Sequence, residues 1–118
     1  MDVILKSFSL NTKPGDIINI TSNVESCLLE TGLKDGIVCV FIAGSTAGHL
    51  RSFLLKPELT VPFSKKLILG TWQQIIMLEL DEKKRTRKIY CQFIGKWIVI
   101  RNKFSLNKIY YYRLDFYF

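Results

Sequence analysis

The six-residue run Ile37-Val38-Cys39-Val40-Phe41-Ile42 constrains the fold more than any other feature of the sequence. β-Branched and aromatic side chains follow one another there with no polar residue between them. That composition favours extended backbone, and a continuous apolar run is typical of a strand inside a sheet. The run therefore predicts a central β-strand that is buried on both faces and follows a turn at Lys34-Asp35-Gly36.

Further extended segments supply neighbours for this strand. Strands are predicted at residues 2–10, 17–20, 59–62, 67–69, 71–80 and 88–93. In the last of these, Ile89, Cys91 and Phe93 alternate with polar residues, which indicates one buried face. The turn at 81–84 predicts that the last two strands form a hairpin. Trp72, Ile75, Met77, Val40 and Phe41 are assigned to core or subunit packing.

One helix is predicted over residues 22–32. Ser22 and Glu25 have the spacing of a capping box, and apolar residues recur at helical intervals up to Gly32, which is a typical stop. The fold class that follows is α+β, with an antiparallel sheet and one amino-terminal helix.

The size and composition suit one domain that neither crosses a membrane nor forms disulfides. The chain has 118 residues, and its longest apolar runs fall well short of the roughly 20 residues of a membrane span. Its three cysteines, Cys27, Cys39 and Cys91, form no CxxC pair, and an odd count does not suit a disulfide framework. We expect buried free thiols and a cytoplasmic location.

The net charge of +7 raises the question of nucleic-acid binding. Residues 1–95 hold 12 basic and 9 acidic side chains, whereas residues 96–118 hold five basic and one acidic. More than half of the excess therefore lies in the aromatic carboxy-terminal stretch, which we separate as an extension of a domain at 1–95. The basic cluster between Lys83 and Lys88 fits a solvated turn, so nucleic acid is an unlikely partner.

A polar, glycine-containing loop follows the central strand and carries the one histidine. Its sequence is Gly44-Ser45-Thr46-Ala47-Gly48-His49-Leu50-Arg51. Backbone amides, two hydroxyls and a guanidinium together suit the oxygens of a phosphate. A plain connecting loop would use the same residues, and no Walker or Rossmann glycine spacing is present.

The run Leu67-Ile68-Leu69-Gly70-Thr71-Trp72-Gln73-Gln74-Ile75-Ile76, followed by an acidic residue and a basic turn ending in Arg87-Lys88, resembles the hallmark of the YjbQ family. This is also called the secondary thiamine-phosphate synthase family. The amino-terminal part resembles it too, through Asp16 to Thr21 and Lys34 to Val38, so the resemblance covers about residues 3–95.

The resemblance implies a two-layer, sandwich-like α+β fold, a homo-trimer and a pocket for a small phosphorylated ligand. Within that pocket, His49 and Arg51 would be catalytic, and Ser45, Thr46 and Gln73 would bind substrate or phosphate. The segment 44–47 resembles the family's HTTA motif, and the segment 48–51 resembles the later GHxHLRA motif.

The sequence departs from the family pattern between Ala47 and Gly48, where a long stretch with a second helical region is missing. The family's divalent metal would lie at His49. However, an open metal site typically needs three protein ligands, and only His49 remains of the expected histidines and carboxylates. The residues therefore argue against a bound metal.

Two functions remain open from the sequence. The first is a diminished thiamine-phosphate synthase with a remnant phosphate pocket. The second is a non-catalytic structural or anion-binding oligomeric module, which the missing residues favour.

Overall fold

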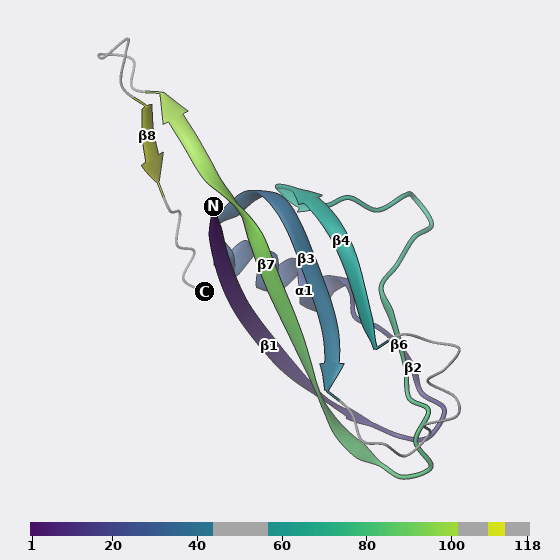
Figure 1. Ribbon diagram of the computed structural model, residues 1–118. Coiled ribbons are helices and arrows are strands. Elements are labelled where there is room, and N and C mark those ends of the chain that lie inside the picture. Colours follow the sequence, from purple (N-terminus) through teal and green to yellow (C-terminus); the bar gives the residue numbers. More distant parts are fainter. Residues whose placement is uncertain (44–56, 102–108, 113–118) are drawn as a thin grey trace.

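The body of the protein is an antiparallel sheet with one helix packed behind it (Figure 1). The computed structural model describes residues 1–43, 57–101 and 109–112, with side chains up to residue 97. The strand order is β1-β7-β3-β4-β5, and β8 pairs with the far end of β7. The strands are β1 (Asp2–Thr12), β3 (Leu33–Ala43), β4 (Glu58–Ser64), β5 (Lys66–Leu67), β7 (Arg85–Arg101) and β8 (Ile109–Tyr112).

Side chains that alternate along the strands place the core on one face of this sheet. Ile89, Cys91 and Phe93 of β7 are fully buried, as their spacing predicted. They lie beside Val38 and Val40 of β3 and, further along, Val61 and Phe63 of β4. The rings of Phe63 and Phe93 meet edge to face, with their centroids 5.9 Å apart. Burial of this stripe is the main stabilising contribution, because apolar area is removed from water there.

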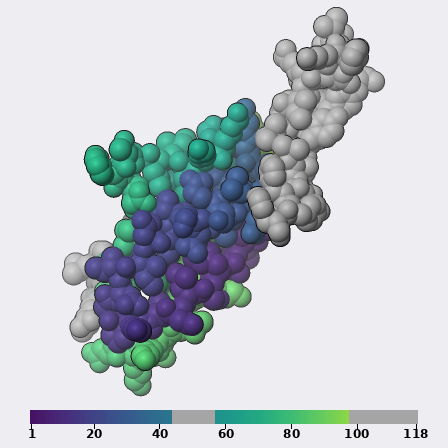
Figure 2. Space-filling model, turned by 180° about the vertical axis from the view of Figure 1, so that it is seen from behind, coloured from purple at the N-terminus to yellow at the C-terminus, as the bar shows by residue number. Residues whose placement is uncertain are grey.

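Helix α1 (Thr21–Thr31) covers the core-facing side of the sheet and buries Val24, Cys27 and Leu28. In the view from behind, the purple to blue surface of the amino-terminal part, which includes α1, covers the middle of the molecule (Figure 2). Gly32 ends the helix in the left-handed conformation at φ 71°, as predicted.

The predicted capping box is wrong. The residue at the N-cap is Ile20, which has no side-chain cap. The Glu25 carboxylate instead accepts a hydrogen bond from the backbone N–H of Leu67, 3.1 Å away, and so ties the helix to β5. Asn19 Oδ1 accepts the N–H of Thr21 at 3.0 Å, which satisfies one of the free amides at the helix start.

A two-stranded ribbon completes the layer behind the sheet. It pairs β2 (Ile17–Asn19) with β6 (Ile76–Leu78). The predicted strand at 71–80 is therefore much shorter, and its predicted hairpin with the next strand does not form. Two backbone hydrogen bonds explain this, since Gly15 donates to Glu79 O and Glu79 donates to Asp16 O. They hold the end of β6 against the 13–16 turn rather than against β7.

Strand β3 is central, between β7 and β4, but it is not buried on both faces as predicted. Ile37 and Phe41 are 44% and 43% exposed, because nothing in the described part of the chain packs on that side of the sheet. The predicted turn at 34–36 lies inside β3, where the pairing with β7 shifts register between Leu33 and Asp35.

The predicted α+β class is confirmed, with a mainly antiparallel sheet and a single helix in the described residues. That helix has 11 residues, and none of the described segments forms a helix that is long and apolar enough to cross a bilayer. β7 runs through Gly95 without a break and ends at Arg101.

Candidate functional site

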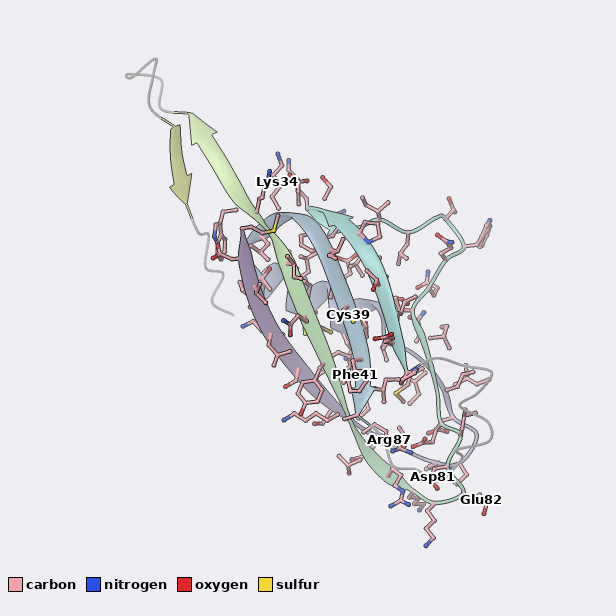
Figure 3. All side chains as sticks on the ribbon, viewed as in Figure 1. Lys34, Cys39, Phe41, Asp81, Glu82 and Arg87 are labelled. Carbon is pink, nitrogen blue, oxygen red and sulfur yellow. The ribbon has the colours of Figure 1, made fainter. Side chains whose placement is uncertain are left out.

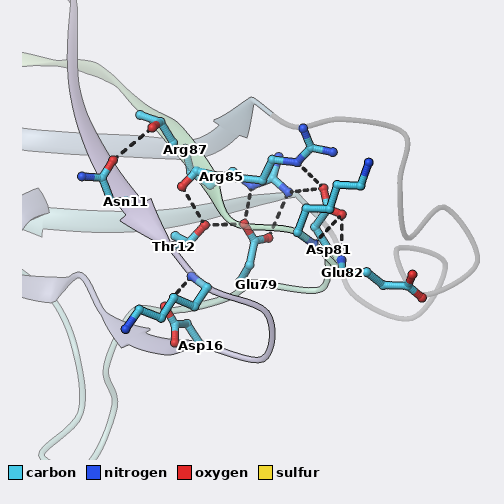
Figure 4. Close-up of polar contacts among 11 residues, drawn as sticks. Asn11, Thr12, Asp16, Glu79, Asp81, Glu82, Arg85 and Arg87 are labelled. Carbon is cyan, nitrogen blue, oxygen red and sulfur yellow. Dashed lines mark hydrogen bonds and ion pairs between the residues drawn. The ribbon is translucent and has the colours of Figure 1, made fainter.

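A network of buried charges lies where β1, β6 and β7 meet (Figure 4). Arg87 binds Glu79 through two contacts, Nε to Oε1 at 2.7 Å and Nη2 to Oε2 at 2.9 Å. Its Nη2 also lies 3.4 Å from Asp81 Oδ2, which Arg85 Nε contacts at 2.6 Å. The hydroxyl of Thr12 donates to Glu79 Oε1. Five side chains from the ends of β1 and β7 and from the segment after β6 are thereby held together.

Burial and pairing oppose each other in this network. Glu79 and Arg87 are 4% and 8% exposed. Burial alone would raise the pKa of Glu79, but the hydrogen bonds from Arg87 and Thr12, the charge of Arg87 and a backbone hydrogen bond from Asp81 together lower that pKa. The same hydrogen bond from Arg87 to Glu79 raises the pKa of the arginine. Both groups are therefore held in their charged forms, as expected for a buried ion-pair network with a structural role.

Sequence reasoning placed Arg87 in a solvated basic turn, and that prediction is wrong for this residue. Lys83 and Lys84 are exposed, whereas Arg87 is buried. The spacing of the charged residues could have indicated the network. Glu79 and Asp81 are two positions apart in the sequence, and so are Arg85 and Arg87. Residues two apart on extended backbone share a face, so acidic and basic pairs on either side of a turn can meet.

A second feature is a tight turn at residues 70–73, which presents Trp72 to solvent. Trp72 is 93% exposed, so it is not part of the core of the chain, and the other predicted role, subunit packing, stays a prediction. Gln73 N donates to Gly70 O at 3.0 Å, and Gly70 N donates to Gln73 Oε1 at 2.7 Å. A side chain at position 70 would sit 3.1 Å from Gln73 Oε1, so glycine leaves room for this amide to fold back.

The third feature is the uncovered side of the sheet, here called the open face. It consists of the side chains of Val3, Leu5, Ile37, Cys39, Phe41, Thr60, Pro62, Tyr90, Gln92 and Ile94, which the register places side by side. Cys39 lies in the middle of the sheet, and Phe41 lies nearer the carboxy-terminal end of β3 (Figure 3). Most of these side chains are apolar, and the charged residues Glu58 and Lys88 lie at one end.

The chain is similar in sequence and in fold to several known proteins. A family model described as UPF0047 protein YjbQ-like matches residues 44–96. A UPF0047 protein of Methanothermobacter thermautotrophicus is 28% identical over 137 residues, covering 81% of this chain and 95% of that protein. A solved structural-genomics target from C. acetobutylicum is similar with a TM-score of 0.69 at 26% identity, covering 76% of this chain and 98% of that one. The chain is thus similar to proteins of the YjbQ (UPF0047) family.

Two further proteins show the same similarity. A YbjQ-like protein of unknown function from Sulfolobus solfataricus shares the fold, with a TM-score of 0.68 at 22% identity over 80% of this chain and 100% of that one. UPF0047 protein YugU of Bacillus subtilis is 26% identical over 133 residues, which span 100% of YugU but 78% of this chain. Since 78% of 118 residues is about 92, about 41 positions of YugU have no counterpart here. This agrees with the internal shortening expected from the motifs.

The polar loop that carries the proposed YjbQ pocket lies outside the described residues. This applies to Ser45, Thr46, His49 and Arg51, whose roles stay predictions. Gln73, the other predicted ligand, is exposed, and its side-chain oxygen accepts the N–H of Gly70. Gln74 Oε1 accepts a hydrogen bond from Asn19 Nδ2 at 3.1 Å. In this conformation the Gln73 oxygen therefore fixes the turn, and the Gln74 oxygen ties the next residue to Asn19 of β2.

The described residues do not fit a metal ion. Across residues 1–43 and 57–97 no three His, Cys, Asp or Glu side chains are grouped to hold one. The two buried carboxylates, Glu79 and Asp81, are bound by arginines, which compete with any cation for the same oxygens.

Proposed function

We propose that this chain is a non-catalytic, self-assembling module of the YjbQ family, in which copies associate through the open face. The observation that carries the proposal is the exposure of apolar side chains across the centre of a sheet. Val3, Leu5, Ile37 and Phe41 are each more than 40% exposed. A contiguous exposed apolar patch on a small domain is typical of an interaction site.

The charge of the chain favours a second copy as the occupant of the open face. Copies that each carry +7 repel one another unless the contact surface is uncharged. In the two central rows across the sheet, Leu5-Gln92-Cys39-Thr60 and Val3-Ile94-Ile37-Pro62, no charged residue is present. An uncharged surface of a second copy can therefore cover these rows without desolvating a charge. The trimer implied by the family resemblance is the state we propose.

The substitution Ile37→Glu tests this assembly. It places a carboxylate at the centre of the open face, opposite Ile94 and Pro62. We expect the dissociation constant of the assembly, measured by sedimentation over a dilution series, to rise by at least about 100-fold, because an unpaired buried charge is costly. The substitution lies on an exposed position, so the monomer should keep its fold.

Leu29→Glu is the matched control for Ile37→Glu. Leu29 is 48% exposed on α1, away from the open face, so the same change in charge should leave the assembly unaffected. Far-ultraviolet circular dichroism checks the fold of both variants. A wild-type chain that sediments as a monomer at all concentrations would refute the proposal, as would equal weakening by the two variants.

Family resemblance supplies the alternative function, a weak thiamine-phosphate synthase with a remnant pocket at the loop of His49 and Arg51. The positions missing relative to YugU are the reason for placing it second. Displacing pyrophosphate needs cationic stabilisation of the leaving group, and a chain that has lost metal ligands supplies less of it. With the pyrimidine diphosphate, the thiazole phosphate and Mg²⁺ we expect no thiamine phosphate above a protein-free blank. Product formation that is lost in His49→Ala would establish the enzyme instead.

Two further parts of the proposal concern ligand and location. Binding of a small phosphorylated ligand at the same loop is tested by calorimetric titration with inorganic phosphate, in wild type and Arg51→Met.

The proposed location is the cytoplasm, supported by the three cysteines, all of which are free thiols in the described residues.

A further inference from the structure

We infer that Trp72 of one copy docks on the open face of the next, so that assembly is head-to-tail rather than face-to-face. This inference rests on the self-assembly proposed above and names the residue that anchors it. Its starting point is the 93% exposure of the indole, the highest among the exposed large apolar side chains of the described residues.

The turn that carries Trp72 is held in place on both sides, so the exposure is not that of a loose end. Before the turn, Ile68 N donates to Pro62 O at 2.9 Å. After it, Ile75 N donates to Thr21 Oγ1 and Ile75 O accepts from Ile20 N, both at 2.9 Å. The segment between β5 and β6 also projects from the side of the molecule in both the front and the rear view (Figure 1, Figure 2). Trp72 therefore stands on a fixed, projecting support.

A fixed and exposed tryptophan is well suited to bind a partner. Little conformational entropy remains to be lost when a preorganised group binds. Tryptophan is also among the residues that dominate the energetics of protein interfaces. The cost of keeping the indole in water is recovered only when another molecule covers it.

The chemistry around Trp72 indicates an uncharged, apolar partner. Residues 67–78 contain no charged side chain. Ile68 and Ile76, on either side of the turn, are 56% and 45% exposed. The open face is the other large apolar surface of the same chain, and its two central rows hold no charged residue. Beside these rows it offers the rings of Phe41 and Tyr90, with Lys88 Nζ 5.2 Å from the centroid of the Tyr90 ring.

The chain therefore has two exposed apolar surfaces, the segment around Trp72 and the open face, and their combination decides the geometry of association. A face-to-face dimer would cover both open faces but leave both Trp72 side chains in water. Docking of Trp72 on the open face of a neighbour covers both surfaces, and such a heterologous contact closes into a ring when the rotation permits. The trimer implied by family resemblance is one such ring.

The experiment uses the full chain with Trp97→Phe, which leaves Trp72 as the one tryptophan. In assembled protein we expect a blue-shifted indole emission that moves to the red when Ile37→Glu dissociates the assembly. In the wild-type background, Trp72→Ala should raise the dissociation constant at least about 30-fold, or about 2 kcal/mol. The control Leu29→Ala, an equally simple truncation of an exposed residue, should leave it unchanged.

A photo-crosslinker in place of Trp72 identifies the partner surface. We expect crosslinks between copies that map to β3 or β7 peptides of the open face. Assembly that persists while Trp72 emits as an exposed indole, and while Trp72→Ala has no effect, would overturn this inference and leave self-assembly intact. Absence of any assembly would overturn both.

Discussion

Arg87→Met is expected to lower the free energy of unfolding by about 3 to 5 kcal/mol, because it leaves a buried carboxylate without its partner. Glu79 would lose both contacts from the guanidinium, at 2.7 and 2.9 Å, and Asp81 would lose one of its two arginines. Domains of this size are stable by about 5 to 15 kcal/mol. The variant should therefore unfold at a markedly lower urea concentration.

Lys84→Met is the matched control for this prediction, since it removes one positive charge from the same basic stretch at an exposed position. Its effect should stay within about 0.5 kcal/mol. A double variant, Arg87→Met with Glu79→Gln, should recover part of the loss because the buried charge is gone. Equal unfolding midpoints for Arg87→Met and Lys84→Met would contradict the structural role of the network.

The pH dependence gives this prediction a second measurement. The pKa of Glu79 is lowered in the folded protein, so its stabilising contribution is present above the unfolded pKa, which is about 4.3. That contribution is lost as pH falls through the folded pKa. The stability difference between wild type and Arg87→Met should therefore be largest near neutral pH and shrink below about pH 4. A difference that stays constant down to acid pH would point to lost packing rather than lost charge pairing.

Elements fixed by local side-chain patterns could be predicted from the sequence. The alternation of Ile89, Cys91 and Phe93 identified the buried face of β7, and Gly32 marked the end of α1. Both signals depend on the residue itself and its near neighbours. The central place of β3 was also correct, because few arrangements accommodate so apolar a strand.

Long-range pairing could not be predicted in the same way. Residues 71–80 have strand-like composition, but the turn closed by Gly70 and Gln73 shortens the strand to Ile76–Leu78. The pairing of β6 with β2 depends on hydrogen bonds between residues more than 50 positions apart, which leave no local trace. The exposure of Ile37 and Phe41 was missed because a continuous apolar run looks the same in a strand that is covered on both faces and in one with an uncovered face.

The site was predicted less well for a related reason. Arg87 was assigned by its basic neighbours, whereas its environment is set by Glu79, eight positions away on another element. Gln73 was chosen as a ligand for its polarity, but its side-chain oxygen accepts a backbone amide within its own turn. Polar residues identified from sequence show what they can bind, and only the fold decides whether that capacity is already used.

Gly95→Ala is the other substitution with a large expected effect. Gly95 lies in β7 opposite Gly36 of β3 and Asp2 of β1. An added methyl would fall on the carbonyl oxygen of Asp35 and lie 3.1 Å from Cζ of Phe63. We expect a loss of about 3 kcal/mol or more in urea unfolding, at the upper end for overpacking, because a backbone atom cannot rotate away as a side chain can.

Gly15→Ala separates this steric effect from the general cost of replacing glycine. Gly15 has φ +80° and no atom within 4 Å of an added methyl, so its substitution should cost only the backbone strain of about 1 kcal/mol. Gly36→Ala should instead match Gly95→Ala, because its methyl would fall on the carbonyl oxygen of Ile94 across the same pair of strands. If all three variants lost the same free energy, close approach of β3 and β7 would not be the reason for glycine at positions 36 and 95. A clear separation of Gly15→Ala from the other two would show that the glycine pair permits the close approach of β3 and β7.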